Sequence, residues 1–214
     1  MSSGSAGVSS GAARKPSRGE IRRAAIVAAA AEVFLEHGFG AATLDDVVRR
    51  AGGSRATLYG AFGSKEGLFA AIIAHQCELI VAPLKALSEE AGAPEDVLTG
   101  VGRRFMEILM SPRGVGLYRM VSAEAARFPA LGVHVFASGP KAAADRLAVY
   151  LQAQVKAGAL SLPDADLAAR HFLEMVKGDL HTRALFNVAP LPTPAEIDVC
   201  VKGAVATFLK GARS

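Results

Sequence analysis

Residues 43–68, TLDDVVRRAGGSRATLYGAFGSKEGL, constrain the fold most, because they predict two short helices joined by a glycine turn. Thr43 has the chemistry of a helix N-cap. Asp46 follows three residues later, where its side chain can accept a hydrogen bond from the backbone N–H of Thr43 and complete a capping box. The two glycines after this helix favour a turn, since glycine reaches positive φ without a Cβ clash. Ser54 can cap a second helix over residues 55–62, so the stretch predicts a helix-turn-helix motif.

The second helix of this motif carries small, hydroxyl-bearing and basic side chains where a core helix would carry apolar ones. We expect only Ala56, Leu58 and Phe62 to face the protein core. Hydroxyl and guanidinium groups can reach phosphates and base edges, and small residues let the backbone approach DNA closely. The pattern favours a helix laid in the major groove of DNA. A two-helix corner inside another all-helical protein is the alternative.

Residues 18–69 resemble the DNA-binding domain of the TetR family of transcriptional regulators. The resemblance is carried by Phe34, Gly38-Phe39, Thr43-Leu44, Thr57-Leu58-Tyr59, Phe62, Ser64-Lys65-Glu66 and Leu68-Phe69. The chain departs from the family at Gly53, where an aliphatic residue is usual, and at Gly60 within the recognition helix. The resemblance implies an all-α protein with a three-helix DNA-binding domain over residues 18–63. A disordered basic tail, residues 1–17, would precede it, and a helical effector-binding and dimerisation domain, residues 64–214, would follow.

Side-chain chemistry and the resemblance together predict the residues that contact double-stranded DNA. They are Arg18, Arg22, Thr43, Ser54, Arg55, Ala56, Thr57, Tyr59, Gly60 and Lys65. Tyr59 and Lys65 resemble family positions that clamp phosphates, whereas Arg55 and Thr57 resemble positions near bases. Gly60 removes a side chain that often touches DNA in the family.

Charge supports the same interpretation. The chain of 214 residues has a net charge of +4, and residues 1–75 hold nine basic and six acidic side chains, so about +3 lies in the N-terminal third. A basic arm beside a helix-turn-helix suits contact with phosphates or the minor groove, although a solvated tail would look the same. No apolar run reaches the roughly 18 residues that span a bilayer. Cys77 and Cys200 read as reduced thiols of a cytoplasmic protein, with a redox switch as the alternative.

Further along the chain, the segments LYRMVSAEAARFP, YLQAQVKAGAL and FLEMVKGDLHTRALF resemble the C-terminal domain of AefR-like TetR regulators. That region binds ligands and forms dimers in the family. Asp164 is predicted to cap one long helix to residue 186, and a last helix covers residues 194–210. The long helix is apolar around most of its circumference, so both helices are predicted to form a homodimer interface, with packing inside one domain as the alternative.

A ligand cavity in the C-terminal domain is the expected site for a small-molecule effector of unknown identity. Its predicted lining is Phe105, Met106, Leu109, Tyr118, Met120, Phe136, Phe172 and Met175, because methionine and aromatic side chains line adaptable apolar cavities. Ordinary core packing is the alternative for each of them. Candidate polar groups are His134, His171, His181, Glu124 and Asp179.

No catalytic, metal or cofactor site is predicted, since the chain lacks a nucleophile elbow, a dinucleotide loop and metal-ligand spacing. The resemblance to the TetR family implies a dimeric repressor that a small apolar or amphipathic ligand releases from a palindromic operator, with no membrane partner. A constitutive DNA-binding protein without an effector and an all-helical enzyme are the alternatives.

Overall fold

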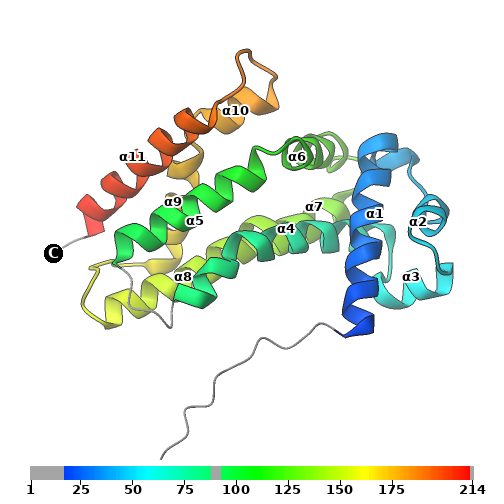
Figure 1. The fold of residues 1–214 in the computed structure, drawn as a ribbon, viewed down its shortest axis with the longest axis horizontal. Helices are drawn as coiled ribbons and strands as arrows, with labels where there is room; N and C mark the ends of the chain where they lie inside the picture. The colour runs from blue at the N-terminus through cyan, green and yellow to red at the C-terminus, as the bar shows by residue number, and fades with distance from the viewer. Residues whose placement is uncertain (1–16, 88–92, 213–214) are drawn as a thin grey trace, which may run out of the picture.

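The structure is a computed structural model that describes residues 17–87 and 93–212 (Figure 1). Every regular element in these ranges is helical, which confirms the predicted all-α class. The predicted disordered tail falls, except for Ser17, outside the described residues. Helices α1–α3 form one end of the molecule, and α8, α9 and α11 lie toward the other (Figure 1).

Local capping explains the three N-terminal helices, α1 (Arg18–Ala41), α2 (Leu44–Ala51) and α3 (Arg55–Phe62). Ser17 and Glu20 form a capping box at α1, and Thr43 and Asp46 form the predicted one at α2. Helix α1 is interrupted at Gly38, whose φ of 75° is open to glycine at little cost. The predicted helix-turn-helix is therefore present, with α2 and α3 on either side of the glycine turn.

An aromatic cluster joins these helices to the rest of the protein. The rings of Phe34, Phe39 and Phe69 lie 5.2 to 5.6 Å apart, and Phe128 stacks edge-on against Phe39 at 5.2 Å. All three central rings are fully buried. This core contains residues of α1, α4, α6 and α7, so the N-terminal helices share one hydrophobic core with the first part of the C-terminal region.

Helix α4 (Lys65–Leu87) leaves this core and packs against α5 (Pro94–Leu109) and α8 (Ala142–Lys156). It continues through Pro83 without being split there. Four of the described helices, α5, α6 (Pro112–Glu124), α7 (Pro129–Phe136) and α11 (Pro194–Ala212), begin with proline, whose fixed φ and missing N–H suit the first helical position.

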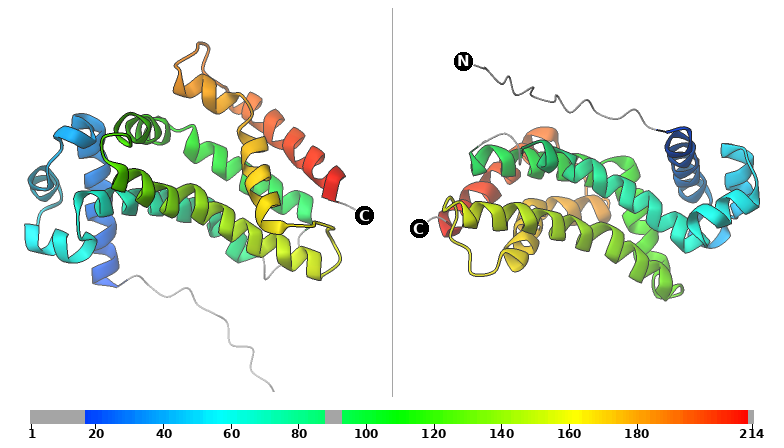
Figure 2. Two further views of the ribbon diagram at one scale, coloured as in Figure 1. Left: turned by 180° about the vertical axis from the view of Figure 1, so that it is seen from behind. Right: turned by 90° about the horizontal axis from the view of Figure 1, so that it is seen from below.

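The segment from α7 to α8 (Ala142–Lys156) is continuous through Gly139-Pro140. A single π turn, η1 (Ala137–Lys141), connects the two helices. A Cβ atom on Gly139 would lie 2.7 Å from Ile73 Cγ2, so glycine allows α4 to approach this turn closely. Helix α4 and the α7–η1–α8 segment consequently run side by side (Figure 2).

The predicted long helix over residues 164–186 is wrong. Asp164 caps α9 (Ala165–Lys177) as expected, but Gly178, with φ of 50°, ends it before α10 (Leu180–Leu185). A Cβ atom on Gly178 would lie 2.9 Å from Cys200 Sγ, so the break is also a close contact with α11 (Pro194–Ala212). Helices α5, α8, α9 and α11 enclose a second core, which includes Leu151 and Phe172.

Candidate functional site

Helix α3 presents most of its surface to solvent at one end of the molecule (Figure 1). Leu58 is buried and Phe62 half-buried, as predicted. Ala56 is exposed, which corrects the expectation that it faces the core. The predicted DNA-contacting residues Arg55, Ala56, Thr57, Tyr59 and Gly60 therefore share an open surface that can enter a groove of DNA.

Arg55 is not free on this surface. Its Nε and Nη2 donate hydrogen bonds to the two carboxylate oxygens of Asp45 on α2. The hydrogen bond from Arg55 holds the pKa of Asp45 below its usual value, so the carboxyl stays ionised. Asp45 was not predicted as a site residue, since helix capping already explains the Asp45-Asp46 pair at the start of α2.

Arg22, predicted to contact DNA, lies against the glycine turn. Its Nη2 donates to the carbonyl oxygen of Gly52 at 2.6 Å, and a Cβ atom on Gly53 would lie 2.6 Å from the same nitrogen. Gly53, with φ of 108°, leaves the space that Arg22 occupies. This contact supplies a physical reason for glycine where the family usually has an aliphatic residue.

Arg23 joins α1 to the end of α3. Its Nη1 donates to the carbonyl oxygen of Ala61 at 3.0 Å, and its guanidinium carbon lies 4.4 Å from the centre of the Phe62 ring. Arg18 stands exposed at the first position of α1. Arg22 and Arg23 of α1 therefore contact the glycine turn and the end of α3, respectively.

Lys65 is half-buried at the start of α4. Its Nζ donates to the carbonyl oxygen of Gly40 at 3.1 Å and lies 4.7 Å from the centre of the Phe39 ring. Burial lowers the pKa of Lys65. Thr43 and Ser54 use their hydroxyl oxygens as caps and accept from the backbone of Asp46 and Thr57 at 3.2 Å each.

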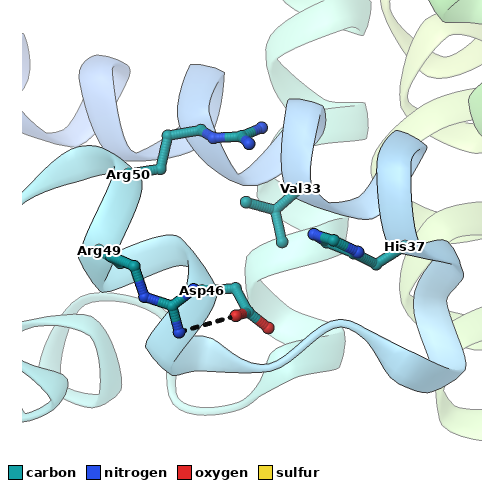
Figure 3. Close-up of a pocket in the computed structure, with 5 residues that line it drawn as sticks. All are labelled: Val33, His37, Asp46, Arg49 and Arg50. Atoms are coloured by element: carbon teal, nitrogen blue, oxygen red, sulfur yellow. Dashed lines mark ion pairs between the residues drawn. The ribbon is translucent and has the colours of Figure 1, made fainter.

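A small pocket of about 260 Å³ lies between α1 and α2 (Figure 3). Its lining is Val33, His37, Asp46, Arg49 and Arg50. Arg49 pairs with Asp46 at 3.1 Å, and Arg50 pairs with Glu36 at 2.6 Å. Because these arginines already have acidic partners, we interpret the pocket as part of the packing between α1 and α2 rather than as a ligand site.

A much larger cavity, of about 1050 Å³, lies in the C-terminal region. Four predicted residues, Phe105, Leu109, Tyr118 and Phe136, line it. The other apolar side chains of its wall include Ile73, Ile108, Leu117, Val121, Val135 and Leu173. The volume is at the upper end of the range for ligand pockets, and the wall is mainly apolar.

The other four predicted ligand residues do not line this cavity. Met106 and Phe172 are fully buried in the C-terminal core. Met175 packs against that same core, and Met120 packs against the N-terminal one. Neighbouring positions on a helix point about 100° apart, so Phe105 faces the cavity while Met106 cannot.

The cavity wall also contains charged groups, several of them paired with one another. Lys141 pairs with Asp145 at 2.7 Å, and Lys177 pairs with Glu174 at 2.6 Å. Of the predicted polar groups, only His181 lines the cavity; His134, His171, Glu124 and Asp179 do not. Within residues 17–87 and 93–212, no group of three His, Cys, Asp or Glu side chains could hold a metal ion.

Burial lowers the pKa of His181 to about 4, and the nearby Lys177 adds to this shift. The ring lies edge-on to Tyr118, with the centres 4.7 Å apart. The imidazole is therefore neutral at ordinary pH, and it adds no positive charge to the cavity wall.

Comparisons with known proteins agree with this arrangement. Residues 26–72 match the family described as bacterial regulatory proteins of the tetR family, and residues 96–211 match the C-terminal domain of AefR-like transcriptional repressors. The chain belongs to the TetR family of transcriptional regulators. It is a DNA-binding regulator, and ligand binding and dimer formation are typical of the family.

Two solved structures resemble this TetR-family chain over most of its length. A TetR-family regulator from Mesorhizobium loti is 26% identical with a TM-score of 0.78, covering 93% of this chain and 100% of that one. The flavonoid-responsive regulator FrrA is 30% identical with a TM-score of 0.65, covering 90% of this chain and 97% of that one. The transcriptional activator FasR of Mycolicibacterium smegmatis is 36% identical over 64 residues, which are 30% of this chain and 29% of that relative.

Helix α1 is long and apolar enough to cross a membrane by composition alone, with a mean hydropathy of 1.3. The family match instead places most of this helix in the DNA-binding region. Its residues Ile26, Val27, Phe34 and Phe39 are buried against the helices of the DNA-binding region. The apolar face of α1 is thus part of a protein core.

Proposed function

We propose that this regulator is a dimeric repressor that a small apolar or amphipathic effector releases from a palindromic operator. The observation that carries the proposal is the large apolar cavity, which shares walls with the helices that hold the DNA-binding region. The proposal includes the division into a DNA-binding domain, residues 18–63, and an effector-binding and dimerisation domain, residues 64–214. It also includes a cytoplasmic location and the absence of catalysis.

Helix α4 is one route by which a ligand could act on DNA binding. Ile73 and Cys77 line the cavity, while Leu68 and Phe69, one to two turns earlier, are fully buried in the N-terminal core. A ligand that pushed against Ile73 would therefore shift a helix that begins three residues after α3 ends. Release requires that the effector bind the shifted arrangement more tightly than the DNA-bound one.

Helix α6 is a second route. Leu117, Tyr118 and Val121 line the cavity, and Gly116 faces α1, where a Cβ atom would lie 2.7 Å from Leu35 Cδ2. Arg119 ties α6 to the end of α10 by donating to the carbonyl oxygens of Ala184 and Leu185 at 2.6 and 2.9 Å. A ligand that displaced α6 would thus act on both α1 and the C-terminal helices.

The exposed faces of α9 and α11 support the proposed dimer. Val199 on α11 is 72% exposed and Leu167 on α9 is 41% exposed, although both are apolar. A Cβ atom on Gly203, one turn after Val199, would meet nothing within 4 Å, so a partner helix could approach this face closely. Val176 and Val205 are buried inside the protomer, so they support the fold rather than the interface. A two-fold dimer would place two α3 helices about 34–36 Å apart, as two half-sites require.

The test of the dimer is Val199→Glu, with His134→Glu as a matched control at an exposed polar position on α7, outside α9 and α11. A charge buried at an interface is costly, so Val199→Glu should give a folded monomer that loses operator affinity. The measurements are light scattering and circular dichroism at micromolar concentration. A wild-type protein that is monomeric, or a Val199→Glu protein that stays dimeric, would contradict this interface.

The name of FrrA, a relative that responds to flavonoids, supports a neutral aromatic or apolar effector for this chain. In the cavity wall, Lys141 and Lys177 are already paired with acids and His181 is neutral, while Arg170 and Asp166 add one charge of each sign, so the wall has little net charge to attract an ion. The test is a screen of hydrophobic compounds, flavonoids included, for thermal stabilisation and for release of operator DNA.

The matched variant is Ala144→Leu, which adds three carbon atoms to a small residue of the cavity wall. It should bind operator DNA normally and lose both the stabilisation and the release. Compounds that stabilise the protein strongly and never change operator affinity would refute coupling between the two sites. If no compound stabilises it, a constitutive DNA-binding protein becomes the better description.

A further inference from the structure

We propose that Asp45 is a specificity-determining residue, which holds the guanidinium of Arg55 so that its free edge reads one guanine in the major groove. The proposal rests on DNA binding through α3, and it is independent of the proposed effector. It names a base and a positioning residue that the predicted set of DNA contacts did not include.

The geometry of the pair determines which donors of Arg55 stay available. Asp45 is the second residue of α2, and Arg55 is the first residue of α3, so the pair bridges the first turns of the two helices. Nε and one Nη2 hydrogen are used by the carboxylate. A guanidinium has five N–H donors in a rigid plane, so three remain available, and the far edge presents one hydrogen of Nη1 beside one of Nη2.

That far edge matches guanine. Guanine presents two acceptors, O6 and N7, in the major groove, and a bidentate arginine is their commonest partner. Adenine replaces one of these acceptors with an amino donor, so it would meet Arg55 with one repulsive contact. A guanidinium held in one plane by Asp45 would discriminate between the two bases better than one that is free to turn toward phosphates.

Arg55 also has little competition for base reading on α3. The sequence of this helix is RATLYGAF, in which Gly60 has no side chain and Ala56 and Ala61 have only methyl groups. The hydroxyl of Thr57 lies 3.0 Å from that of Ser54, and each can satisfy the other. Arg55 is the one side chain of α3 that carries several N–H donors.

A contribution to the stability of the fold is a poor explanation for the ion pair between Arg55 and Asp45. The side chains of Arg55 and Asp45 are 64% and 48% exposed, and exposed ion pairs contribute little to stability. A carboxylate on a surface that approaches phosphates weakens DNA binding in general. An acidic residue at such a place is better explained by what it does to Arg55.

The same domain offers a matched control. Arg50 donates to both carboxylate oxygens of Glu36, at 2.8 and 2.6 Å, and this pair is also partly exposed. It joins α2 to α1 rather than to α3. Glu36→Gln therefore removes an acidic partner of an arginine in the same way as Asp45→Asn, without touching the recognition helix.

The experiment first selects the preferred operator of the wild-type protein from random duplex DNA. Affinities are then measured for all single-base variants of that site with wild type, Asp45→Asn, Asp45→Ala, Glu36→Gln and Arg55→Lys. Thermal unfolding of every variant shows whether it is folded. Loss of preference at a single guanine in each half-site is the expected result for both Asp45 variants, by about ten-fold or more.

Affinity of the Asp45 variants for scrambled DNA should stay the same or rise, because a negative charge has been removed. Arg55→Lys should lose the same guanine preference while it keeps affinity for scrambled DNA, and Glu36→Gln should change neither. Asp45 variants that keep the full preference, or that weaken binding to every sequence equally, would overturn the proposal. A wild-type protein with no preferred sequence would instead count against specific DNA binding as a whole.

Discussion

His181 gives the stability of this protein a predictable dependence on pH. The residue is 5% exposed on α10, and its Nε2 has no hydrogen-bond partner among the described residues. Burial lowers its pKa from 6.5 to about 4 in the folded protein. In the unfolded chain the imidazole is solvated and keeps the ordinary value. Between these two pKa values, the unfolded state therefore binds more protons than the folded state.

Because the folded-state pKa of His181 is lowered, the protein becomes less stable as the pH falls. The contribution of the neutral imidazole to the free energy of unfolding is fully present above about pH 6.5, decreases with pH, and is fully lost at and below about pH 4. At about pH 5, a gap of about 2.5 units between the two pKa values costs about 2 kcal/mol of unfolding free energy. The complete loss, near pH 4, is about 3 kcal/mol and is an upper limit, since partial unfolding can hydrate the ring.

The assay is urea unfolding at about pH 7.5 and about pH 5, at one fixed protein concentration because a dimer couples stability to concentration. His181→Leu has a similar volume and cannot be protonated. Between the two pH values, the unfolding free energy of His181→Leu should fall by about 2 kcal/mol less than that of wild type. Acidic groups with lowered pKa values are common to both proteins, so they cancel in the comparison.

The control is His134→Gln, because His134 is exposed and bonded through Nδ1 to the carbonyl oxygen of Ala130 at 2.7 Å. It should follow the wild-type dependence on pH. If His181→Leu and wild type lose the same free energy between the two pH values, the imidazole is not buried in its neutral form and the reasoning is refuted.

Three further predictions concern single side chains. Tyr59→Ala should weaken binding to operator and scrambled DNA by a similar factor in a salt titration, because Tyr59 is exposed on α3 and is expected to contact phosphate; a selective loss for the operator would contradict that role. Gly53→Ala should destabilise the protein by roughly 1–3 kcal/mol in thermal unfolding, since its Cβ would displace Arg22 and its φ is 108°; unchanged stability would show that the turn can relax. Gly102→Ala should cost roughly 1–3 kcal/mol in the same assay, because its Cβ would lie 2.9 Å from Val201 Cγ1 in a packed core, and a neutral result would reveal unfilled space there.

The features that the sequence predicted well are local. The caps at Thr43, Ser54 and Asp164 were found as expected, because each depends on a side chain and a backbone N–H within three residues. The glycine turn after α2 and the class of the fold follow from equally short patterns. The family resemblance extended this to a DNA-binding role, because many such residue types recur at fixed offsets.

Tertiary structure decided the rest, because it depends on residues far apart in the chain. Gly178 ends α9 where it contacts Cys200 of α11, and Gly139 lies in a π turn that contacts Ile73 of α4. The sequence pattern of a single helix cannot predict contacts with residues so far away in the chain. Only four of eight predicted residues line the cavity, since apolar periodicity marks a buried face without saying whether protein or empty space covers it. The pairing of Asp45 with Arg55 arises in the same way: the sequence supplies the two charges, and only the packing of α2 against α3 brings them within hydrogen-bonding distance.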